Sequence, residues 1–178
     1  MGEDKDREKL AQEDTKKGII MNKKIRKLIS TNARIISLEH GLGEMKAIFP
    51  MYDGIDDYLE VQYLKNDKSK FVNLSDISDL RLLSSRIELD KSLRTLNQKL
   101  NDSEIENETG NYRNTLLEKN TLLLIVKIID LFRKDELSTK EHALLQLQIE
   151  SLITEVKEVY EVDQNCARGI VSDYLKSA

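Results

Sequence analysis

Three side chains in the sequence could supply nucleophilic or acid–base chemistry, namely Cys166, His40 and His142. A catalytic thiol or hydroxyl must lie within hydrogen-bond reach of a base that a third group orients. Nothing in the spacing of these residues brings two of them together. With one cysteine in 178 residues, the chain can form neither an intrachain disulfide nor a zinc site from its own cysteines. We therefore predict a protein that is not an enzyme and has no catalytic residue, cofactor or metal.

Two short motifs resemble ligand-binding loops but lack necessary residues. The stretch Asp53–Asp57 has Ile55 at the third position of a calcium loop and Tyr58 at the sixth, where an oxygen ligand and a glycine are needed. We interpret it as a turn followed by the acidic first turn of a helix. Gly41 and Gly43 lack the third glycine of a dinucleotide-binding loop, so we expect them to end a helix.

The N-terminal part of the chain carries a basic segment. The first 50 residues hold 11 basic and 8 acidic side chains, whereas the rest holds 17 basic and 24 acidic ones. No acid interrupts the basic residues between Thr15 and Leu38, which are Lys16, Lys17, Lys23, Lys24, Arg26, Lys27 and Arg34. This pattern predicts a solvated helix face, a site for an acidic partner protein, or a surface that binds nucleic acid or another anionic surface.

Leucine and isoleucine recur at heptad spacing in three segments, 21–42, 82–100 and 145–159. Such stripes are typical both of a bundle packed on itself and of coiled coils between chains. Because the chain has only 5% aromatic residues, we expect thin seams that a partner helix completes. The residues predicted to form this interface are Leu89, Leu93, Leu96, Leu100, Leu145, Ile149, Leu152, Val156 and Val159.

The periodicity predicts an all-α fold of four to five mostly long helices, elongated, with coiled-coil or helical-bundle segments. Residues 1–17 are interpreted as a disordered or frayed charged arm, 18–47 as a basic amphipathic helix, and 48–75 as a turn and a short element. Residues 55–64 suit either a helix or a strand. The bundle region, 76–178, is predicted to contain helices at about 76–101, 112–134 and 139–175. Ser138 and Glu141 have the spacing of a capping box.

The charged N-terminus is unlike a secretory signal, and the most apolar stretch, 122–132, is interrupted by Lys127 and Asp130. We therefore expect an intracellular protein, nuclear or cytoplasmic. The predicted function is that of a structural or adaptor subunit that joins a multiprotein complex through helix packing, most simply as a hetero-oligomer, although a homodimer stays open. The alternatives are binding of nucleic acid or an anionic surface through 16–34, and an autonomous helical regulatory domain.

Overall fold

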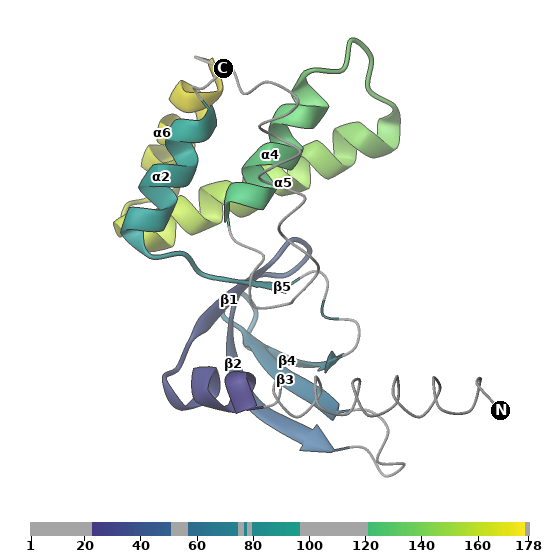
Figure 1. Cartoon of the computed structure of the whole chain (residues 1–178), viewed down its shortest axis with the longest axis vertical. Helices are drawn as coiled ribbons and strands as arrows, with labels where there is room; N and C mark the ends of the chain where they lie inside the picture. The colour runs from purple at the N-terminus through teal and green to yellow at the C-terminus, as the bar shows by residue number, and fades with distance from the viewer. Residues whose placement is uncertain (1–22, 51–56, 75–76, 78–79, 97–120, 177–178) are drawn as a thin grey trace, which may run out of the picture.

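A computed structural model describes residues 23–50, 57–74, 77, 80–96 and 121–176 of the chain. It has a five-stranded antiparallel sheet beside a group of helices, so the prediction of an all-α helical bundle is wrong (Figure 1). Residues 23–30 are helical. The strands are β1 (Arg34–Ser37), β2 (Gly41–Pro50), β3 (Asp57–Tyr63), β4 (Lys68–Asn73) and β5 (Leu80–Leu82). The helices that follow are α2 (Arg86–Leu96), α4 (Thr121–Phe132), α5 (Thr139–Tyr160) and α6 (Gln164–Lys176).

The predicted helix over 18–47 is not continuous, because residues 23–30 are helical and the β1–β2 hairpin follows, while residues 18–22 lie outside the described residues. Asn32 has a φ of 51° and Gly41 a φ of 75°, so the chain leaves helical geometry before β1 and turns again after it. Between these breaks lies the β-branched pair Ile35 and Ile36, which suits a buried strand. Gly43 lies within β2, where an added Cβ would come 2.9 Å from a Val61 methyl carbon. Neither glycine ends a helix.

Of the two alternatives for residues 55–64, helix or strand, the described part is a strand, and a further strand, β4, follows within 48–75. Residues 57–63 form a strand, so Asp57 begins β3 and not a helix, while Asp53 and Asp56 lie outside the described residues. The strand order is β4-β3-β2-β1-β5. A β-bulge at Lys46 shifts the pairing of β2 with β3 and reverses the alternation of side chains along β2, so that Met45 and Ile48 share one face and Ala47 and Phe49 share the other.

One face of the sheet carries the core of this part of the molecule. Alternate residues of the strands, such as Met45 and Val61, point to this face because side chains alternate along a strand. Ile25 from the helix of residues 23–30 packs into the same core. Its buried members are Ile25, Ile35, Met45, Leu59, Val61, Tyr63, Leu74, Ile77 and Leu80.

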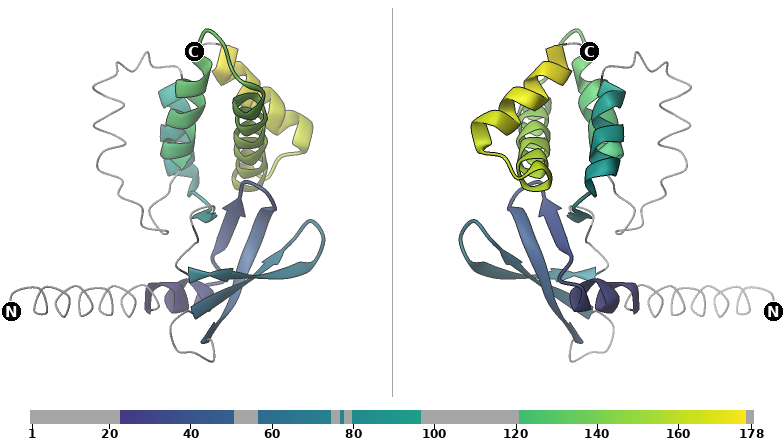
Figure 2. Two further views of the ribbon diagram at one scale, coloured as in Figure 1. Left: turned by 90° about the vertical axis from the view of Figure 1, so that its right-hand side faces the viewer. Right: turned by 90° about the vertical axis from the view of Figure 1, so that its left-hand side faces the viewer.

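The four later helices pack on one another at the opposite end of the molecule (Figures 1 and 2). The predicted helix over 76–101 begins only at Arg86, because 80–82 form β5, and 97–101 lie outside the described residues. The helix predicted at 112–134 is described from Thr121 to Phe132. The helix predicted at 139–175 is two helices, separated where Glu161 adopts a left-handed conformation with φ 57°. Gly169 lies inside α6.

The capping box at the start of α5 is confirmed. The Ser138 hydroxyl accepts a hydrogen bond from the backbone N–H of Glu141, and the Glu141 carboxylate accepts one from the backbone N–H of Ser138. Lys134 Nζ lies 2.5 Å from the same carboxylate. These groups, Lys134 first, lower the pKa of Glu141 from 4.5 to about 2.

The lowered pKa of Glu141 predicts a specific acid sensitivity. Because the unfolded chain binds a proton at Glu141 more readily than the folded one, this stabilising contribution is complete above about pH 4.5 and is lost as pH falls towards 2. We expect Glu141→Gln to lower the thermal midpoint at pH 6 and to differ less from the wild type near pH 2. Thermal unfolding of the wild type and the variant between pH 6 and pH 2 measures this difference in midpoint, and Glu136→Gln, at an exposed position, is the control. A difference independent of pH would contradict the prediction.

Candidate functional site

The second face of the sheet is divided into a covered and an open half. Near β1 and β5, the side chains of Ile36, Leu42 and Arg81 are buried, and α5 contacts both β1 and β2 there. At the border, Arg34 lies 3.3 Å from Glu158 of α5 and 3.9 Å from Glu44 of β2. The far half of this face, on β2, β3 and β4, has no helix packed on it among the described residues.

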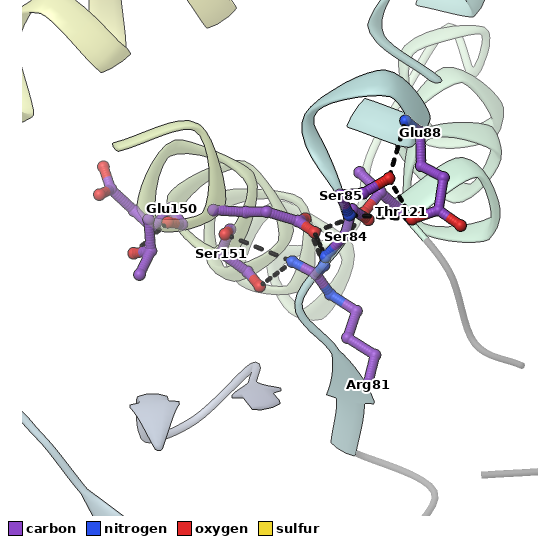
Figure 3. A network of polar contacts seen from close by, with 9 residues as sticks. Arg81, Ser84, Ser85, Glu88, Thr121, Glu150 and Ser151 are labelled. Carbon is purple, nitrogen blue, oxygen red and sulfur yellow. Dashed lines mark hydrogen bonds and ion pairs between the residues drawn. The ribbon is translucent and has the colours of Figure 1, made fainter. Parts of the chain in front are cut away.

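A buried polar network fixes the sheet against the helices (Figure 3). Arg81 of β5 forms an ion pair with Glu155 of α5, and both side chains are almost wholly buried. The Arg81 guanidinium also donates to the Ser151 hydroxyl at 3.0 Å. The Glu155 carboxylate accepts from the Thr121 hydroxyl at 2.6 Å and from the backbone N–H of Ser84 at 3.0 Å. One carboxylate thus joins β5, α4 and α5, which holds the two parts of the molecule in a defined arrangement.

A second tie joins α2 to the end of α5. The Tyr160 hydroxyl donates to the Asp90 carboxylate, and the Arg86 guanidinium lies 5.1 Å from the centre of the Tyr160 ring. Burial, followed by the hydrogen bond to Asp90, raises the pKa of Tyr160 well above its ordinary value. The phenol therefore stays protonated and keeps its donor role across the physiological range.

The open half of the sheet face carries an aromatic cluster, which we call the aromatic platform and define as Phe49, Tyr58 and Phe71. Phe49 is paired directly with Tyr58 across β2 and β3, so their side chains share a face. Phe71 of β4 is opposite Glu60, which lies on that face too. The rings of Phe49 and Phe71 meet edge to face, 5.5 Å apart, yet these residues remain 45% and 59% exposed. Exposed aromatic groups of this kind mark interaction surfaces.

Strand β4 forms an edge of the sheet next to this platform. In the described part of the chain it pairs only with β3, so its outer backbone groups have no strand partner. Lys68 and Lys70 are exposed on β4 and point to the face opposite Phe71, since side chains alternate. Lys70 Nζ lies 2.6 Å from His40 Nε2, and a Glu39 carboxylate oxygen lies 3.1 Å from the same nitrogen.

The residues predicted to face partner helices lie in the helical core of the chain itself. Five of them are almost completely buried, namely Leu89, Leu93, Leu96, Leu152 and Val156. Leu145 is also buried, with 9% of its surface exposed. Ile149 and Val159 pack against this cluster and are partly buried, and Leu100 lies outside the described residues. The heptad stripes are thus occupied by contacts between α2, α4, α5 and α6.

The predicted basic residues are divided between exposed and paired positions. Four of them, Lys23, Lys24, Arg26 and Lys27, are exposed on the helix of residues 23–30. Arg34 begins β1 and is held by Glu44 and Glu158. Lys16 and Lys17 lie outside the described residues.

The residues that could do chemistry are not brought together. His40 lies in the β1–β2 hairpin, His142 is exposed in the first turn of α5, and Cys166 is exposed in α6. Among the described residues there is no group of three or more His, Cys, Asp or Glu side chains that could hold a metal ion. Sequence reasoning missed the aromatic platform. Its signal was the alternation of Tyr58, Glu60 and Gln62 with Leu59, Val61 and Tyr63, a pattern of period two.

Comparison with known proteins adds no family to these observations, because the chain matches no family model and no curated protein. Within the described residues, every helix is too short or too polar to cross a bilayer.

Proposed function

We propose that this protein is a non-enzymatic adaptor subunit that binds a partner protein through the aromatic platform and the edge of β4. The observation that carries the proposal is the exposure of Phe49 and Phe71 on a half-covered sheet face, directly beside an edge strand without a second neighbour in the described residues. Antiparallel edges accept an extended segment by backbone hydrogen bonds, and neighbouring side chains then give specificity.

The side chains around β4 indicate the chemistry of the partner. An added strand would place alternate side chains on the two faces of the sheet. On one face they would meet the ring of Phe71, which favours apolar residues. On the other face they would meet Lys68 and Lys70, which favour carboxylates. We therefore propose an extended segment in which apolar and acidic residues alternate.

The rigid connection of the sheet to the helices supports an adaptor role. The Arg81–Glu155 pair and its hydrogen bonds leave the helices in a fixed position relative to the platform. A partner bound at β4 would consequently be held at a fixed distance from a second protein that contacts the helices. The interface residues predicted from the heptads fill the helical core, so the proposed docking surface is the platform and not the seams.

Substitution of the platform tests the proposal. We expect the double variant Phe49→Ser, Phe71→Ser to lose at least about tenfold in affinity for the partner, because exposed aromatic anchors dominate such interfaces. The wild type and the variant, each as the 178-residue chain, serve as baits in an extract of the cells that naturally express the protein, and a captured protein is then tested in purified form. Synthetic segments of that protein, titrated into the isotope-labelled wild type, must shift the backbone resonances of β4.

The matched control is Ile87→Ser, since Ile87 is a large apolar side chain on α2 that is 82% exposed and away from the platform. This variant should retain the partner, and all variants should unfold at similar temperatures. Equal capture by the platform variant would overturn the proposal. Capture that a nuclease abolishes would do so as well, and would favour binding of nucleic acid through Lys23, Lys24, Arg26 and Lys27.

A further inference from the structure

A cleft of about 640 Å³ lies where the β1–β2 hairpin meets α5. Its walls come from residues 37–42 of the hairpin, from residues 64 and 65 after β3, from α5 and from the start of α6. The volume is within the range of pockets that bind small molecules, about 300–1,000 Å³. The proposed docking surface at β4 does not use this cleft.

The charges around the cleft leave it with a positive balance. Two of its three carboxylates are paired with a guanidinium, since Glu150 lies 2.9 Å from Arg168 and Glu158 lies 3.3 Å from Arg34, and the third, Glu39, lies 3.1 Å from a ring nitrogen of His40. Two lining lysines are less engaged. Lys157 lies 3.7 Å from Glu158, and that carboxylate is also paired with Arg34. Lys65 forms no ion pair within the described part of the chain.

The same cleft exposes apolar side chains from both walls. Leu64 after β3 and Leu147 of α5 are each 46% exposed. Leu38 and Leu42 of the hairpin also line the cleft. Partly exposed leucines that face one hollow gain free energy when an apolar group displaces water from them, at about 25 cal/mol per Å².

We propose that this cleft binds an amphiphilic organic anion, whose apolar body contacts Leu64 and Leu147 and whose anionic head group contacts Lys65 and Lys157. An alkyl carboxylate is the simplest ligand of this class. Because the cleft is lined by both the hairpin and α5, bound ligand adds contacts between the sheet and the helices. Binding should therefore raise the unfolding temperature of the whole chain.

Titration of the 178-residue chain with three ten-carbon amphiphiles, each below its critical micelle concentration, tests the proposal. These are decanoate, decanol and decyltrimethylammonium, which share the apolar body and differ in the charge of the head group. We expect decanoate to bind saturably, more tightly than decanol, and the cation to bind least. Resonances of residues 37–42 and of Leu147 should shift with decanoate.

Variants separate the two contributions. Lys65→Gln and Lys157→Gln should each weaken decanoate binding about two- to fivefold, the range of a partly exposed ion pair, and leave decanol unaffected. Leu147→Ser should weaken both ligands. Lys140→Gln, an exposed lysine of α5 outside the cleft, is the control and should change neither. Equal affinity for the three head groups, no saturable binding, or shifts confined to the aromatic platform would overturn the proposal.

Discussion

Replacing Glu155 by alanine is expected to lower the free energy of unfolding by about 3–5 kcal/mol, the cost typical of removing one partner from a buried ion pair. The Glu155 side chain is fully buried, and Arg81 is nearly so. Alanine would leave the Arg81 guanidinium buried without its carboxylate, and the Thr121 hydroxyl and the Ser84 N–H without their acceptor. The Nε of Arg81 already has no hydrogen-bond partner in the described structure, so few neighbouring groups could replace the lost carboxylate. Urea unfolding monitored by circular dichroism measures the difference.

Two further variants show whether the loss comes from the unpaired charge. Glu150→Ala removes another carboxylate from the same helix, but Glu150 is exposed and pairs with Arg168, so we expect a change below about 1 kcal/mol. The double variant Arg81→Met, Glu155→Leu removes both charges and should recover part of the stability, because buried pairs are often replaced by apolar groups at little cost. A Glu155→Ala variant as stable as Glu150→Ala would contradict the inferred role of the network.

The helical character of the later segments was predictable, although the bounds of the helices were not, and the sheet was not predicted at all. The helical stripe that contains Leu145, Leu152 and Val156 extends over more than four turns, and few strands are long enough to imitate it. The β1 strand has four residues, and its Ile35 falls by chance on the same heptad series as Ile25 and Leu28. A short apolar run fits either period. Only the pairing of β1 with β2 and β5, which is a contact distant in sequence, settles the matter.

The capping box shows what local sequence can specify. Ser138 and Glu141 satisfy each other's backbone N–H groups within four residues, so their spacing alone was sufficient. The aromatic platform depends on three strands. Phe49 and Phe71 are brought together by the register of β2 with β3 and of β3 with β4, which no single segment contains. The Arg81–Glu155 pair likewise joins residues far apart in the chain, and a charged residue inside a stripe of mixed polarity gives no sign of burial.

The question of whether the leucine stripes form a core or a partner seam has a direct experimental answer. We expect Leu152→Ala to destabilise the isolated chain by about 2–5 kcal/mol, since it removes a buried side chain from a filled core and leaves a cavity. Leu147→Ala, five residues earlier in α5 and 46% exposed, should cost less than about 1 kcal/mol. The comparison holds residue type and helix constant, so the difference reports burial within the chain itself. If Leu152→Ala unfolded at the same denaturant concentration as the wild type, the helical core of a single chain would be incomplete, and Leu152 would have to be buried by a partner helix as its heptad spacing predicts.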